Sequence, residues 1–156
     1  MSSNVRAIIV IVLVIGGLAA VGFVLRDRLG ASPGGLQVGD CFQVPVGDTV
    51  SSIQHLPCTD PHDGEVFVVR DYTGGDPYPT VDQLRAWVAA ECIAKDFPAY
   101  TGSSYDDRDD LTVAFFYPPE DAWANGQRTM ICYLNPNGGG TVTSSYRAGQ
   151  PVASPS

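Results

Sequence analysis

Two stretches of this chain decide its fold: LQVGDCFQV, Leu36–Val44, and LPCTDPHDGEVFVV, Leu56–Val69. Their cysteine-bearing segments have the character of strands, and a turn sequence at Pro61–Gly64 then precedes another strand that begins at Glu65. Each stretch carries one cysteine, Cys41 or Cys58, with no second cysteine at CxxC spacing. In an oxidising compartment, two such cysteines indicate a disulfide rather than a zinc site or a redox motif.

An uncharged apolar block near the N-terminus, AIIVIVLVIGGLAAVGFVL over residues 7–25, predicts a transmembrane helix. At 1.5 Å per residue it would span about 28 Å, close to the roughly 30 Å hydrocarbon core of a bilayer. A cleaved signal peptide is the alternative, but its apolar core usually has about 7 to 15 residues. We therefore expect a cytoplasmic head over residues 1–6, an uncleaved transmembrane helix over 7–25 and a flexible tether over 26–35.

The cysteines decide on which side of the membrane the rest of the chain should lie, because the few arginines flanking the apolar block barely distinguish the two sides. All four cysteines follow residue 35, and disulfides form outside the cytoplasm. We expect a single-pass protein of the cytoplasmic membrane with an extracytoplasmic domain over residues 36–147 and a disordered tail over 148–156.

The part of the chain after the apolar block is strongly acidic. From residue 29 onward, six basic side chains stand against sixteen acidic ones, which leaves a net charge of −10. Such a field repels phosphate backbones and anionic headgroups, which argues against binding to nucleic acid or to a membrane surface. The densest acidic run, Asp106–Asp110, lacks the spacing of an EF-hand loop, and we interpret it as a solvated loop rather than a calcium site.

One helix is predicted after the first strands. Thr80 is a suitable N-cap, and Gln83 three residues later completes a capping box. The apolar positions that follow are spaced by three and four residues, with Trp87 on their flank: Val81, Leu84, Val88 and Cys92. This stripe directs Cys92 toward the core. The helix should run to about Lys95, because Phe97-Pro98 is a helix-ending sequence.

Further strands are predicted over residues 50–55, 66–72, 110–117 and 128–134, with one helical turn over 120–124 and an edge strand over 141–146. Alternation in the 128–134 strand puts Cys132 on one face with Met130 and Leu134. Of the three pairings possible for four cysteines, we expect Cys41–Cys58 and Cys92–Cys132, because each joins neighbouring elements. The fold class is α+β: a transmembrane helix, then a small, mostly antiparallel sheet with one packed helix and two disulfides.

Several motifs in this order resemble the actinobacterial septum-formation domain family. They are GDCF (39–42), CTDPHDGEVF (58–67), Glu91-Cys92, WANGQRTMIC (123–132) and SSYRAG (144–149). The resemblance covers roughly residues 36–149. It implies a membrane-anchored or lipid-anchored extracytoplasmic module associated with septation, and it implies neither a catalytic activity nor a ligand.

His62 lies among the carboxylates Asp60, Asp63 and Glu65, a composition compatible with a metal site or a general base. We favour a structural interpretation, in which an aspartate closes the turn and His62 packs or hydrogen-bonds back onto the sheet. A zinc site built from His55, His62 and Glu65 is the alternative, although nothing in the spacing makes these residues converge. We expect no metal and no cofactor.

The sequence WANGQR, 123–128, is interpreted as a turn. Gly126 would adopt a positive φ, Trp123 would cover the edge of the core, and Arg128 would pair with an acidic neighbour such as Glu65. Tryptophan and arginine are also frequent hot spots of protein interfaces. The candidate binding residues are therefore His62, Glu65, Trp123 and Arg128, and we expect no catalytic residue.

The function that we expect is a non-catalytic interaction module of the cell envelope, anchored in the membrane, that binds protein partners and, by resemblance, acts in septum formation. One alternative is an envelope sensor or enzyme that binds a metal or ligand at the His62 turn. Another is an accessory subunit that docks into a membrane complex through its transmembrane helix, where Gly16 and Ala20 stand at small-xxx-small spacing. The sequence indicates no oligomeric state.

Overall fold

A computed structural model describes residues 35–47 and 52–149 of the chain. The predicted head, the predicted transmembrane helix over 7–25 and all but the last residue of the tether lie outside these residues, as does the tail from residue 150. Within the described residues, no helix combines the length and the hydropathy needed to cross a membrane.

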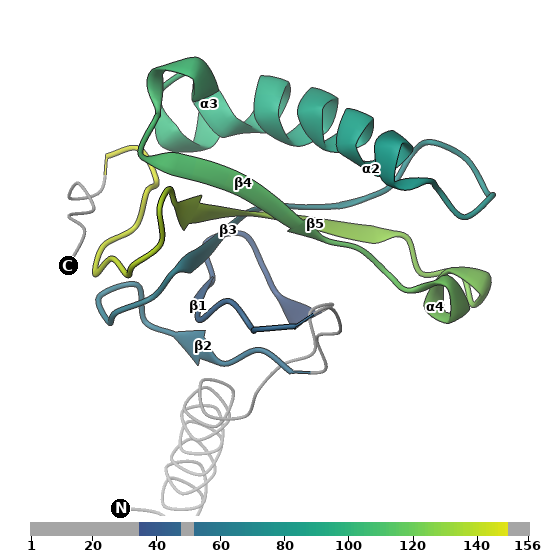
Figure 1. Ribbon diagram of the computed structural model, residues 1–156, viewed down its shortest axis with the longest axis horizontal. Coiled ribbons are helices and arrows are strands. Elements are labelled where there is room, and N and C mark those ends of the chain that lie inside the picture. Colours follow the sequence, from purple (N-terminus) through teal and green to yellow (C-terminus); the bar gives the residue numbers. More distant parts are fainter. Residues whose placement is uncertain (1–34, 48–51, 150–156) are drawn as a thin grey trace, which may run out of the picture.

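Five strands form one antiparallel sheet in the order β2-β1-β3-β5-β4 (Figure 1). They are β1 (Cys41–Phe42), β2 (His55–Leu56), β3 (Gly64–Asp71), β4 (Leu111–Phe116) and β5 (Thr129–Pro136). The short helices η3 (Tyr105–Asp107) and α4 (Glu120–Ala124) precede and follow β4, and α4 is the predicted helical turn. The long strands β3 and β5 form the centre of the sheet.

One predicted strand is shorter than expected, and a second does not form. Of the predicted 50–55 strand, residues 50 and 51 lie outside the described residues, Ile53 is a single bridge residue and β2 begins only at His55. The predicted edge strand over 141–146 is wrong, because only Val142 forms a bridge, with His62. The backbone N–H of Tyr146 instead donates to the side chain of Glu65 in β3.

Strand alternation explains how the two faces of the sheet are filled. Met130, Cys132 and Leu134 of β5 share the face under the helix, as predicted, whereas Ile131 and Tyr133 face the opposite core. β3 has a bulge, because Val66 pairs with Tyr133 and Val68 pairs with Cys132, which leaves Phe67 between them without a partner. Phe67 and Val68 consequently both point into the helix-side core.

A helix of three consecutive segments covers one face of the sheet (Figure 1): α2 (Val81–Trp87), the π-helical η2 (Val88–Asp96) and α3 (Phe97–Thr101). Its capping box is confirmed. The Gln83 N–H donates to Thr80 Oγ1 at 3.3 Å, and the Thr80 N–H donates to Gln83 Oε1 at 2.9 Å.

The prediction that Phe97-Pro98 ends the helix is wrong. In η2 the Phe97 N–H donates to the carbonyl of Cys92, five residues back. A proline in an α-helix leaves the carbonyl four residues before it without a donor. The wider π-helical turn before Pro98 changes this pairing of N–H and carbonyl groups. The core residues of the helix step by four, four and then five residues: Leu84, Val88, Cys92 and Phe97. The π segment keeps all four on the same face. The predicted place of Val81 in the core stripe is also wrong, since Val81 is 52% exposed and Trp87 occupies the core instead.

Both predicted disulfides are present. Cys41–Cys58 joins β1 to the segment before the His62 turn across 17 residues, and Cys92–Cys132 joins the helix to β5 across 40 residues. By the loop-entropy model they stabilise the fold by about 3 and about 4 kcal/mol, respectively.

Candidate functional site

Glu65, at the start of β3, is a carboxylate with no exposed surface. Three donors bind it: the Tyr100 hydroxyl and the Ser145 hydroxyl, each 2.6 Å from Oε1, and the Tyr146 backbone N–H, 2.8 Å from Oε2. Among the described residues, no basic side chain forms an ion pair with it. The hydrogen bonds therefore compensate the buried charge, and they tie α3 and the C-terminal segment to the sheet.

This environment affects the titration of the two tyrosines. Burial, followed by the hydrogen bond to Glu65, raises the pKa of Tyr100 well above its usual value. Burial, followed by the negative charges of Asp110 and Glu65, raises the pKa of Tyr146 to about 12. Both phenols keep their protons at neutral pH, so Tyr100 remains a donor to the carboxylate.

His62 is also fully buried, in the turn before β3. Its backbone pairs with Val142 in both directions, at 2.9 and 2.8 Å. Ring atom Nδ1 lies 2.8 Å from the Asp60 carbonyl oxygen, and because a carbonyl can only accept, Nδ1 carries the ring proton. Nε2 is buried and has no hydrogen-bond partner within the described residues. His62 is thus covered by its own turn and the C-terminal segment, which agrees with the structural interpretation.

The alternative zinc site of His55, His62 and Glu65 is not assembled. His55 lies on β2 with Nδ1 3.3 Å from Asp40 Oδ2, and Glu65 already accepts three hydrogen bonds. In the part of the chain that the structure describes, the one set of three or more possible ligands with converging atoms is Cys41, Cys58 and His62. Sequence reasoning missed this set, because it assigned the two cysteines to a disulfide and considered His62 only with carboxylates.

Trp123 and Arg128 form a separate cluster around α4. Trp123 is only 3% exposed, and its indole N–H donates to the Asp76 carbonyl at 2.9 Å. The Arg128 guanidinium lies over the indole, 4.2 Å from the ring centroid, and donates to the Trp123 carbonyl at 2.6 Å. Gly126 has φ +88°, as the turn requires. Trp123 therefore covers the core edge and offers little surface to a partner.

The expected pairing of Arg128 with Glu65 is wrong, and the register of the sheet explains why. Glu65 pairs with Leu134, whereas the other end of β3, Asp71, pairs with Thr129 beside Arg128. Six residues of strand separate the two positions, a distance of about 20 Å at ~3.4 Å per residue.

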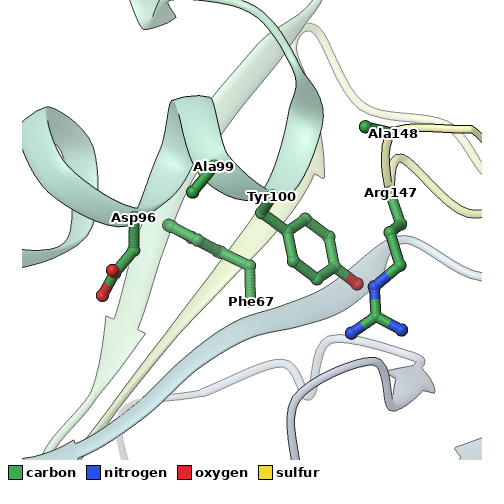
Figure 2. A pocket seen from close by; sticks show the side chains of 6 residues that line it. All are labelled: Phe67, Asp96, Ala99, Tyr100, Arg147 and Ala148. Atoms are coloured by element: carbon green, nitrogen blue, oxygen red, sulfur yellow. The ribbon is translucent and has the colours of Figure 1, made fainter.

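A shallow hollow of about 260 Å³ lies beside α3 and the C-terminal segment. Its lining consists of Phe67, Asp96, Ala99, Tyr100, Arg147 and Ala148. Figure 2 shows Asp96 and Arg147 on opposite sides, with the rings of Phe67 and Tyr100 between them. Asp96 is bound by Arg70 at 2.8 Å, whereas Arg147 lies over the Tyr100 ring, 5.2 Å from its centroid. Such an open hollow is better suited to a weak contact with a polar group than to enclosing a substrate.

β4 forms one edge of the sheet, and its sequence, LTVAFF, has no charge and no proline. Val113 and Phe115 pack against the helix-side core, and Ala114 and Phe116 pack against the opposite core, all four half-buried. No strand pairs with its outer side within the described residues. Edge strands usually carry charges, prolines or bulges that block pairing, and β4 carries none of these.

A family model described as septum formation matches residues 38–153. No curated protein and no solved structure matches the chain. The matched residues include all five strands, both disulfides and Glu65 with its three donors. This chain therefore belongs to the septum formation family.

Proposed function

We propose that this chain is a non-catalytic interaction module of the cell envelope that is anchored in the membrane by residues 7–25 and binds a protein partner during septum formation. Family membership supports the septal role. The two disulfides support an extracytoplasmic domain, and the apolar block supports the anchor. The observation that carries the proposal is the open, apolar edge of β4.

β4 can receive an extended segment of a partner as an additional strand. The outward N–H and C=O groups of an edge strand provide main-chain hydrogen bonds, and alternate side chains of the added strand provide specificity. Because β4 is apolar on both faces, the added strand would extend the helix-side layer beyond Val113 and Phe115 and the opposite layer beyond Ala114 and Phe116. Anchoring in a membrane raises the local concentration of both partners, which favours a contact of this modest size.

The charges around β4 indicate the chemistry of the partner segment. Acidic residues lie at both ends of the strand, Asp109 and Asp110 before it and Glu120 and Asp121 after it. Of these, Asp110 is paired with Arg108 at 2.7 Å. The segment that fits has an uncharged, apolar centre and lysine or arginine near its ends.

Site-specific photocrosslinking in intact envelopes tests this proposal. A crosslinker at Thr112 in β4 should give one defined product whose partner peptide has this composition. The same crosslinker at Ala86, on the exposed side of α2, should not. Ala114→Lys should abolish the Thr112 product, because a charged edge blocks strand addition, and the matched change Ala86→Lys should leave it intact. A Thr112 product that persists in Ala114→Lys would exclude the edge as the binding surface.

Docking through the transmembrane segment remains a prediction outside the described residues. If the span carried the interaction, Gly16→Leu with Ala20→Leu would remove the co-purifying partner and Ala114→Lys would not. The opposite pattern is expected from binding at β4.

A further inference from the structure

We propose that, when the Cys41–Cys58 disulfide is reduced, Cys41, Cys58 and His62 form a binding site for a zinc ion. One ring nitrogen of His62 and the two sulfur atoms lie within 4.8 Å of one another. Zinc binds sulfur at about 2.3 Å and nitrogen at about 2.0–2.1 Å, so ligand atoms of a tetrahedral site lie about 3.5–3.8 Å apart. Two sulfur atoms that are no longer bonded separate to about this distance. Small side-chain movements therefore suffice to build the site.

The hydrogen bonding of the His62 ring resembles that of a metal-binding histidine. Its Nδ1–H donates to the Asp60 carbonyl at 2.8 Å, and metal-binding histidines usually donate their second ring N–H to a carbonyl or carboxylate in this way. This hydrogen bond leaves the lone pair on Nε2, which is fully buried and has no partner among the described residues. A metal ion would satisfy the nitrogen that the disulfide form leaves without a partner.

His55 shows that a buried ring nitrogen without a hydrogen-bond partner is not sufficient to make a metal site. Its Nε2 is also buried without a hydrogen-bond partner, but His55 belongs to no group of converging ligands within the described chain. The two histidines therefore provide a matched pair for experiments.

The Cys41–Cys58 disulfide is more accessible to reductants than the Cys92–Cys132 disulfide. Cys58 is half-buried, whereas Cys92 and Cys132 are fully buried. A dithiol can attack Cys58, transfer two electrons and two protons to the Cys41–Cys58 pair and leave as a disulfide. Binding of Zn²⁺ then displaces the two thiol protons, since zinc takes cysteine as thiolate. In the reverse direction, a disulfide compound takes two electrons from the two thiolates and two protons from the solvent, leaves as a dithiol, and the re-formed Cys41–Cys58 disulfide releases Zn²⁺. The site is therefore controlled by the redox state.

Cobalt(II) alone serves as the spectroscopic probe. The whole 156-residue chain, reduced with a phosphine and separated from it without oxygen, should bind one Co²⁺ with a thiolate-to-cobalt charge-transfer band. The oxidised chain should show none. Bound Zn²⁺ should slow the alkylation of Cys41 and Cys58 at least tenfold by mass mapping. His62→Ala should weaken Co²⁺ binding at least tenfold, and His55→Ala should leave it unchanged.

Two further measurements keep the test decisive if a variant or the reduced chain does not fold. In the wild-type chain, ¹⁵N resonances of the His62 ring should move on addition of Zn²⁺ while those of His55 stay. If reduction unfolds the domain, Zn²⁺ should restore its circular dichroism, because metal binding is coupled to folding. No stoichiometric uptake by the reduced chain, or uptake that leaves the His62 ring unchanged, would overturn the proposal. The β4 interaction is independent of either result.

Discussion

Replacing Tyr100 by phenylalanine tests whether the Glu65 cluster holds the helix to the sheet. The ring keeps its contact with Phe67, at 6.1 Å between centroids, and only the hydroxyl 2.6 Å from Glu65 Oε1 is lost. A hydrogen bond to a charged group contributes about 1.5–3 kcal/mol. Because Glu65 has no exposed surface, we expect the upper part of this range. A loss of about 2–3 kcal/mol is a large share of the ~5–15 kcal/mol by which a domain is stable.

Urea unfolding with both disulfides intact measures this loss, and the m value should not change. Tyr105→Phe is the matched control: its ring packs on Phe97 at 5.2 Å, its hydroxyl has no hydrogen bond within the described structure, and the expected change is below about 0.5 kcal/mol. Ser145→Ala removes the second donor to the same oxygen. Combined with Tyr100→Phe it should deviate from additivity by at least ~0.5 kcal/mol. Equal losses for Tyr100→Phe and Tyr105→Phe would refute a stabilising role of the cluster.

Three further changes probe other parts of the fold. Gly64→Ala should lower the free energy of unfolding by about 1–3 kcal/mol in urea titrations, since a Cβ there would lie 2.6 Å from Cζ of the buried Phe42. Replacing both Cys92 and Cys132 by alanine should cost about 4 kcal/mol, which appears as a lowered melting temperature in calorimetry. Alkaline unfolding followed by circular dichroism should show stability falling from about pH 10 to about pH 12. The unfolded chain loses the Tyr146 proton near 10 and the folded one near 12, and Tyr146→Phe should reduce this slope.

The sequence was sufficient for the elements whose pattern is local. Alternation around Cys132 and the helical spacing of Leu84, Val88 and Cys92 placed two cysteines on facing surfaces, and this predicted the disulfide between them. The Thr80 capping box needed only four residues of sequence.

The parts that sequence reasoning missed depend on distant or compensating contacts. Pro98 is tolerated in the helix because a π segment precedes it, and only the five-residue step from Cys92 to Phe97 in the core pattern could have indicated that segment. The donors of Glu65 come from residues 35 to 81 positions away. A carboxylate in an acidic turn sequence gives no sign that it will be buried and bound by tyrosine and serine rather than by an arginine such as Arg128.

The distance in sequence between Glu65 and Tyr146, 81 residues, sets the order in which a growing chain can complete this domain. β3 is synthesised long before Ser145 and Tyr146, and until they emerge the Glu65 carboxylate gains more from hydration than from burial. Packing of α3 around this buried carboxylate therefore waits for Ser145 and Tyr146. A chain cut short before residue 145 would lack two of the three donors that satisfy the buried Glu65 carboxylate.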